Sequence, residues 1–226
     1  MEILNRYAII VAGGSGTRMN SSVPKQFLKV AGKPILMHTI EKFIETDPQT
    51  TIVLVLPLQE IATWKSLVKK HQFKHQVQIA EGGRSRFASV KNGLKVIEEE
   101  EALVAIHDGV RPCISPETIE RSYEHAAIYG SAITSVPLKD SIRLIKEKNS
   151  NEAVDRSMYR LIQTPQTFKL SLIRDSYQTT ELPHFTDDAS VAEHASNRIH
   201  LIEGSYLNLK ITTPDDLVIA ECLLSY

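Results

Sequence analysis

The stretch YAIIVAGGSGTRM, at Tyr7–Met19, predicts a β-strand that runs directly into a glycine-rich loop. Its first six residues are apolar or aromatic without interruption, which is typical of a strand buried on both faces. The glycines allow backbone N–H groups to turn toward a ligand and form a nest for phosphate oxygens. The loop is neither a Walker motif nor a G-x-G-x-x-G dinucleotide fingerprint. A plain strand-to-helix turn flanked by surface cations is the alternative interpretation.

Short apolar runs alternate with helical patterns along the rest of the chain. Further strands are predicted at Thr51–Leu56, Val77–Ala80, Leu103–His107 and Ser131–Val136. Apolar residues recur at helical spacing between them, first over 36–44 and again over 87–97. This alternation predicts an α/β fold, with a mostly parallel, Rossmann-like sheet covered by helices on both faces. At 226 residues, we expect one domain over 1–226.

One segment breaks this alternation. Between Lys139 and Arg160 charged and apolar residues alternate around a polar turn at Asn149–Asn151, which predicts a protruding β-hairpin arm over about residues 139–160. An isolated two-stranded hairpin is only marginally stable in water. We therefore expect the arm to pack against another surface, and a second copy of the chain is the natural candidate.

The overall composition limits the classes of partner. The formal net charge is -1, which gives no general attraction to nucleic acid or to an anionic membrane. The two cysteines, Cys113 and Cys222, lie far apart, which favours free thiols in a reducing cytoplasm. No signal-peptide pattern and no run of 18 apolar residues is present in the sequence, so we expect a cytoplasmic protein without membrane spans. His71 and His75 are spaced like a metal pair on a helix, but without a third ligand nearby we interpret them as a solvated helix end.

Charged residues cluster at two predicted strand ends. Arg18 and Lys25 flank the glycine loop, and two such cations suit a triphosphate. The motif HDGVRP follows another strand, and the carboxyl ends of strands are where open α/β sheets bind ligands. Its Asp108 could hold Mg²⁺ while phosphates supply other ligands. Arg111 either binds a ligand or serves only as a salt-bridge partner of Asp108.

Nine segments carry a resemblance to a known family. In chain order they are AGGSGTRM, PKQFL, GKPIL, EGGRSRFASV, HDGVRPC, VDRS, QTPQTF, TDDASVAE and NLKITTPDDL. From Ala12 to Leu217 they resemble the 2-C-methyl-D-erythritol 4-phosphate cytidylyltransferases of the non-mevalonate isoprenoid pathway. The glycine loop alone is common to many sugar nucleotidyltransferases, whereas the later motifs belong to a narrow group. That group also holds the ribitol 5-phosphate cytidylyltransferases of teichoic acid synthesis, which remain the alternative.

The resemblance implies a nucleotidyltransferase fold and transfer of CMP from CTP to a polyol phosphate, with release of pyrophosphate. It implies a catalytic set of Arg18, Lys25, Arg156 and Lys210, and Mg²⁺ at Asp108. The implied CTP-binding residues are Ala12, Gly13, Gly14, Gly16, Gly82, Gly83, Arg86, Ser89 and Gly109. The implied polyol-phosphate residues are Arg111, Ser141, Arg156 and Thr164.

The resemblance also implies a homodimer in which the arm crosses into the partner, so that Ser141 and Arg156 would serve the neighbouring site. The sequence itself leaves open whether they act within one chain or between two. A non-catalytic nucleotide sensor on the same fold is the rival from another class. It would have no reason to keep Arg18, Lys25, Asp108, Arg156 and Lys210 together.

Overall fold

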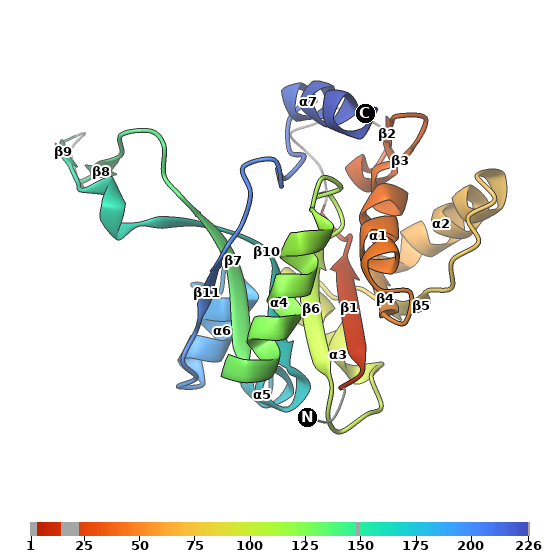
Figure 1. Ribbon diagram of the computed structural model, residues 1–226, viewed down its shortest axis with the longest axis horizontal. Coiled ribbons are helices and arrows are strands. Elements are labelled where there is room, and N and C mark those ends of the chain that lie inside the picture. The colour runs from red at the N-terminus through yellow and green to blue at the C-terminus, as the bar shows by residue number, and fades with distance from the viewer. Residues whose placement is uncertain (1–3, 15–22, 148–149, 226) are drawn as a thin grey trace.

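A seven-stranded sheet forms the centre of the computed structural model, which describes residues 4–14, 23–147 and 150–225 (Figure 1). Across the sheet the strands follow the order β11-β7-β10-β6-β1-β4-β5. Their bounds are β1 Arg6–Val11, β4 Thr51–Leu56, β5 Gln78–Glu81, β6 Leu103–Asp108, β7 Ser131–Pro137, β10 Arg160–Lys169 and β11 Leu201–Glu203. Only β10 runs antiparallel to its two neighbours, β6 and β7. The predicted mostly parallel α/β sheet is confirmed.

All the strands predicted from the sequence are present, with ends shifted by at most one residue. The central ones are buried on both faces, as the uninterrupted apolar runs predicted: Ile9 and Ile10 point to opposite faces of β1, and both are inaccessible to solvent. Strand β10, which lies between β6 and β7, was not predicted from the sequence. Its residues include buried glutamine and threonine side chains, so it lacks the apolar signal of the other strands.

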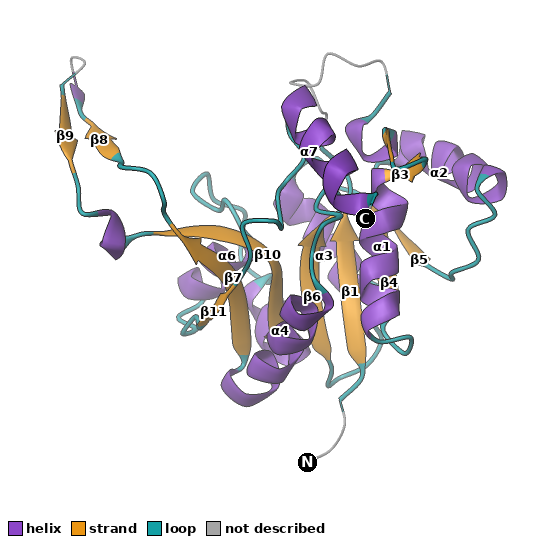
Figure 2. Ribbon diagram, turned by 45° about the horizontal axis from the view of Figure 1, so that its top comes forward, coloured by secondary structure: helices purple, strands orange, loops and turns teal. Residues whose placement is uncertain are grey.

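Helices cover both faces of the sheet, as predicted. Their bounds are α1 Ile35–Thr46, α2 Leu58–Lys70, α3 Arg86–Lys95, α4 Pro116–Tyr129, α5 Leu170–Ser176, α6 Asp188–His194 and α7 Pro214–Leu224. Side chains of α1, α2 and α4 share one core cluster with Ile10 of β1. Side chains of α3, α5 and α6 share the other with Ile9. Helix α7 packs on a third, smaller cluster around Ile35 and Ile211, above the carboxyl ends of the strands (Figure 2).

Two short segments lie beside α1 and link β1 to it. The 3-10 turn η2 spans Lys25–Phe27, and strands β2 (Lys29–Val30) and β3 (Lys33–Pro34) form a small antiparallel pair. The carbonyl of Leu28 accepts a hydrogen bond from the first amide of α1, at Ile35. This packing places the PKQF motif at the carboxyl end of β1.

The segment from 139 to 160 contains a short exposed hairpin that extends away from the sheet (Figures 1 and 2). Strands β8 (Arg143–Ile145) and β9 (Asn151–Ala153) pair antiparallel, and the 3-10 turn η4 (Arg156–Met158) follows. The turn was predicted over Asn149–Asn151, but its last residue is wrong: Asn151 begins β9 and pairs with Ile145 of β8. Asn149 lies outside the described residues.

The remaining expectations concern membranes, cysteines and histidines. Within the described ranges, no helix has the length and apolar character needed to cross a membrane. Cys113 and Cys222 are both free thiols. His71 ends α2 and His75 lies beyond that helix, and the part of the chain that the structure describes contains no group of three potential metal ligands among His, Cys, Asp and Glu.

Candidate active site

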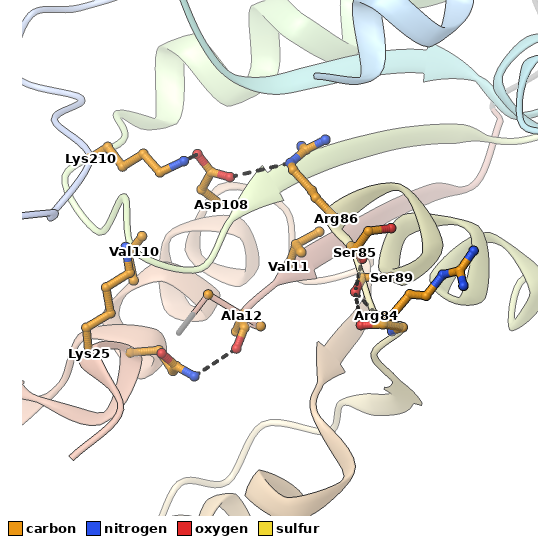
Figure 3. A pocket seen from close by; sticks show the side chains of 14 residues that line it. Val11, Ala12, Lys25, Arg84, Ser85, Arg86, Ser89, Asp108, Val110 and Lys210 are labelled. Carbon is orange, nitrogen blue, oxygen red and sulfur yellow. Dashed lines mark hydrogen bonds and ion pairs between the residues drawn. The ribbon is translucent and has the colours of Figure 1, made fainter. Parts of the chain in front are cut away.

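A cavity of about 220 Å³ opens at the carboxyl ends of β1 and β6 (Figure 3). Open α/β sheets bind their ligands at this edge. Five separate segments supply its lining: the end of β1 with the start of the glycine loop, η2, the loop before α3 with the first turn of α3, the end of β6, and the segment before α7. The lining residues are Val11, Ala12, Gly13, Gly14, Lys25, Gln26, Gly83, Arg84, Ser85, Arg86, Ser89, Asp108, Val110 and Lys210. Gly16 and Arg18, both predicted for this site, lie outside the described residues.

Asp108 ends β6 and is the point where three cations meet. Its Oδ2 lies 3.0 Å from Nζ of Lys210 and 3.2 Å from Nε of Arg111, while its Oδ1 lies 4.0 Å from Nε of Arg86. Burial of Asp108 opposes ionisation, but the charges of Lys210, Arg86 and Arg111 outweigh it and hold the pKa of the carboxyl well below its usual range. Asp108 is therefore ionised at neutral pH, and Figure 3 shows Lys210 and Arg86 reaching it from opposite sides.

Arg86 is fixed by a second carboxylate, that of Asp188 at the start of α6. Two guanidinium nitrogens donate to the two Asp188 oxygens, at 2.9 and 2.6 Å, and the Tyr177 hydroxyl adds a third hydrogen bond at 2.6 Å. Burial lowers the pKa of Arg86, yet the charge of Asp188 outweighs this and raises it, so the guanidinium stays charged. Asp188 belongs to the TDDASVAE segment of the resemblance, but no role was predicted for it.

The loop before α3 is held tightly against its own helix. Gly83 N–H donates to Oγ of Ser89 at 3.0 Å, and Ser85 caps α3 by accepting from the amide of Ala88. A Cβ on Gly83 would lie 2.4 Å from Cβ of Ala88, so this position has no room for a side chain. Gly82 lies behind the cavity wall, where its amide donates to the carbonyl of Leu56.

Lys25 and Gln26 enter the cavity from η2. Nζ of Lys25 lies 3.4 Å from the carbonyl oxygen of Ile211, beside the Lys210 segment. The side-chain amide of Gln26 donates to the carbonyl of Ala12 at 2.8 Å and also to the carboxylate of Glu60. Gln26 thereby holds the first residue of the glycine loop. The contact between Gln26 and Glu60 was not predicted, because nothing in the sequence pattern places residue 60 beside residue 26.

A second cavity, of about 210 Å³, adjoins the first and shares Arg86, Asp108 and Lys210 with it. Arg111 and Thr164, two of the residues predicted to bind the polyol phosphate, also line it. Its other lining residues are Ile162, Gln163, Gln166, Thr186 and Asp187.

Besides Gly82, three predicted site residues line neither cavity. Ser141 and Arg156 are exposed residues of the arm segment and line neither cavity, and the Arg156 guanidinium donates to the carbonyl of Lys139. Gly109 packs under the first cavity: its amide donates to the carbonyl of Val11 at 2.9 Å, and an added Cβ would lie 3.0 Å from Cβ of Ala12.

Arg111 makes the salt bridge that the alternative interpretation of the HDGVRP motif proposed. Its Nε binds Asp108, and its terminal nitrogen donates to the carbonyl of Asn208 at 2.8 Å. The same side chain also lines the second cavity. The pairing therefore does not prevent a contact with ligand.

Comparison with known proteins decides the family. The model of the 2-C-methyl-D-erythritol 4-phosphate cytidylyltransferase family matches residues 7–226. The chain belongs to this family. Proteins carrying the family's name include one from Bacteroides thetaiotaomicron, 46% identical over 98% of this chain and 100% of its own length, and one from Bacillus licheniformis, 39% identical over 98% and 96%. The resemblance found in the motifs is confirmed, and the ribitol alternative is not favoured.

Solved structures of the family share the fold. The 4-diphosphocytidyl-2C-methyl-D-erythritol synthase of Anaerococcus prevotii superimposes with a TM-score of 0.83 at 28% identity, over 97% of this chain and 96% of that one. The 2-C-methyl-D-erythritol 4-phosphate cytidylyltransferase of Francisella tularensis gives a TM-score of 0.78 at 30% identity, over 97% and 99%. The predicted nucleotidyltransferase fold is confirmed.

Proposed function

We propose that the chain transfers a cytidylyl group from CTP to 2-C-methyl-D-erythritol 4-phosphate and releases pyrophosphate. Family membership supports this reaction and favours it over transfer to ribitol 5-phosphate. The observation that carries it is the convergence of Lys25, Arg86 and Lys210 with Asp108 on one cavity at the carboxyl edge of the sheet. A non-catalytic nucleotide sensor would need no such set of charges.

The chemistry follows from charge. An oxygen of the polyol phosphate attacks the α-phosphorus of CTP, and the bond from that phosphorus to the oxygen bridging to the β-phosphate breaks. Pyrophosphate leaves with the electron pair. Such a transfer needs positioning and charge neutralisation rather than a protein nucleophile. Lys25 and Lys210 both supply positive charge to the cavity, and Arg18 is the third cation of the proposed set.

We assign CTP to the first cavity. The backbone of Ala12, Gly13 and Gly14, together with Gly16, receives the triphosphate, where N–H groups and Lys25 balance its charge. On the other side Gly83, Arg86 and Ser89 face the cavity and contact the nucleoside. Gly109 holds the backbone of Val11, which lines the cavity, and Gly82 anchors the loop that carries Gly83 to the carbonyl of Leu56, so both support the site without lining it.

Asp108 fits a role in holding Mg²⁺. It is the only carboxylate among the described residues that line the first cavity, it is ionised, and its Oδ1 lies beyond hydrogen-bond distance of the nearest arginine. Mg²⁺ typically takes one or two carboxylates and completes its shell with phosphate oxygens and water. When bound, the ion would neutralise charge on the phosphates. Asp108 would hold it, while Lys210 and Arg86 keep the carboxylate in place.

The polyol phosphate belongs in the second cavity, with Arg111 and Thr164 in its wall. Ser141 and Arg156 line neither cavity of their own chain, so we propose that the 139–160 arm supplies them to the partner in a homodimer of single-domain subunits. Exposed apolar residues on the arm and on β10 (Leu144, Ile145, Met158, Tyr159, Leu161 and Ile162) support burial against a second copy. We place the enzyme in the cytoplasm, where Cys113 and Cys222 remain thiols.

Pyrophosphate release with a panel of substrates tests the proposal. CTP with 2-C-methyl-D-erythritol 4-phosphate should support turnover, which should require Mg²⁺ and be lost in EDTA. Ribitol 5-phosphate should be a poor acceptor, and ATP should be a poor donor. Faster turnover with ribitol 5-phosphate would replace the proposed acceptor, and equal turnover with ATP would overturn the assignment of the first cavity.

A further inference from the structure

His107 precedes Asp108 on β6, and its imidazole is completely buried. Both ring nitrogens have partners: Nε2 lies 3.2 Å from the carbonyl oxygen of Arg111, and Nδ1 lies 3.1 Å from Oγ1 of Thr164 on β10. The same Thr164 oxygen accepts the backbone N–H of Asp108 at 3.0 Å. The ring of His107 thus joins the strand that carries Asp108, the turn that carries Arg111, and β10.

The chemistry of the partners fixes where each hydrogen lies. A carbonyl oxygen can only accept, so Nε2 of His107 carries the ring hydrogen and donates it to Arg111. A buried imidazole is neutral in the absence of a compensating anion on the ring, so Nδ1 is an acceptor. The one hydroxyl hydrogen of Thr164 therefore points at His107. Since a hydroxyl has one hydrogen, Thr164 has none left to donate to a substrate phosphate.

We propose that His107 is a positioning residue. It accepts the hydroxyl hydrogen of Thr164, so that the Thr164 hydroxyl supports the backbone of Asp108 instead of donating to the polyol phosphate. The proposal rests on the proposed function. Thr164 remains in the wall of the second cavity, but its hydrogen bonds serve the protein. Asn208 joins the same network: its side-chain amide donates to the backbone carbonyl of Thr164 at 2.8 Å, and its backbone carbonyl accepts from Arg111. We call this network of hydrogen bonds among His107, Thr164, Asp108, Arg111 and Asn208 the brace.

The brace has a kinetic signature. The backbones of Asp108 and Arg111 both bond to the brace, so loss of the brace should shift the Asp108 carboxylate and the Arg111 guanidinium, which serve the transfer step. Displacements of about 1 Å in such groups can cost on the order of 100-fold in rate. We expect kcat to fall, with little change in KM for the polyol phosphate. A threonine that held the phosphate directly would instead show its effect in that KM.

Kinetics of four single variants and one double variant test this. Thr164→Val removes the hydroxyl, and His107→Phe keeps a ring of similar shape beside Phe43, whose centroid lies 5.1 Å away. Each should lower kcat roughly 10- to 100-fold, and the double variant should be little worse than either, because both break one unit. Thr164→Ser keeps the hydroxyl and should retain most of the wild-type activity. Thr167→Val, which removes another buried threonine hydroxyl of β10 that donates to Ser122, should leave kcat within about 2-fold.

A selective rise in KM for the polyol phosphate in Thr164→Val, without a fall in kcat, would overturn the proposal. Additive losses in the double variant would overturn it as well. Melting temperatures and circular dichroism of all variants identify any that fail to fold. For those, the spectroscopic test of the wild-type protein decides.

The tautomer of His107 is measurable without any activity. In long-range ¹H–¹⁵N spectra of protein labelled at histidine, the His107 signals are identified by sequential assignment of the wild-type protein, so the test does not depend on a folded variant. At neutral pH they should show the Nε2-protonated tautomer, with an Nδ1 shift that moves in Thr164→Val. An Nδ1-protonated or doubly protonated ring would overturn the proposal. If wild-type protein fails to turn over CTP, the proposed function fails while this measurement still tests the brace.

Discussion

Nζ of Lys210 lies 3.0 Å from Oδ2 of Asp108, which joins the segment before α7 to the end of β6. The lysine side chain is partly exposed, whereas the carboxylate is almost fully buried. Because Asp108 is ionised, it holds the ammonium group at the rim shared by the two cavities before any substrate arrives. Preorganised charge of this kind is effective in catalysis, because it needs no rearrangement during the reaction.

Replacing Lys210 with methionine should remove that charge and keep most of the side-chain volume. We expect kcat to fall on the order of 10²–10³, as for loss of one group that stabilises developing negative charge. Lys65→Met, at an exposed position of α2, is the matched control and should behave like wild type. Turnover of Lys210→Met within a few-fold of wild type would contradict a catalytic role for this residue.

Acid should weaken the fold through Asp108. Its pKa is depressed in the folded state relative to the ordinary aspartate value of 3.8, so its contribution to stability is complete above that value and is lost as the pH falls below it. The free energy of unfolding of wild type should therefore fall steeply below about pH 4. In urea titrations, Asp108→Asn should be less stable at pH 7 but less sensitive to acid. Asp175→Asn, at an exposed position of α5, should keep the wild-type slope. Equal acid slopes for Asp108→Asn and wild type would refute this.

Gly83→Ala should damage the nucleotide side of the site selectively. The new Cβ would lie 2.4 Å from Cβ of Ala88 and 2.9 Å from its backbone carbon, so the loop before α3 must move. We expect KM for CTP to rise about 10-fold or more, as for a displaced binding loop. KM for the polyol phosphate serves as the internal control and should change little. An unchanged KM for CTP would show that the loop does not contact the nucleotide.

Mixed dimers should reveal whether the arm acts in the neighbouring subunit. Lys25→Ala and Arg156→Ala should each be inactive alone. If Arg156 serves the partner, a dimer of the two variants contains one site with both residues intact, and mixing should restore up to about half of the wild-type activity per mixed dimer. After verified subunit exchange, absence of recovery would reject the shared site, and a monomer by light scattering would reject it directly.

Much of the fold could be predicted because most of the strands are marked in the sequence by short uninterrupted apolar runs. The runs at β1, β4 and β6 are apolar on both faces, and two of them end in the glycine loop and in Asp108, which fall together because parallel strands share a carboxyl edge. Strand β10 carries no such signal. Gln166 and Thr167 are buried there, and their side chains are satisfied by hydrogen bonds to Asp187 and Ser122. The local sequence does not reveal those partners.

The same reason explains which parts of the site were missed. Cations beside a phosphate loop are visible in the sequence, so Lys25 was predicted from its position, whereas Arg86 was predicted only from the resemblance. The contacts that fix them are between distant residues: Asp188 holds Arg86 and Glu60 holds Gln26. The two ring contacts of His107 are equally invisible, because a histidine at the end of an apolar strand has the same pattern whether it is a ligand or a brace.

The most direct test of the proposed reaction is ³¹P NMR of the purified protein with Mg²⁺, CTP and 2-C-methyl-D-erythritol 4-phosphate. We predict loss of the CTP signals and the monoester signal together, with equal amounts of pyrophosphate and of a new diphosphate diester. Lys25→Ala should leave all starting signals in place. Release of CMP without a diester, or an unchanged spectrum with folded wild-type protein, would contradict cytidylyl transfer to this acceptor.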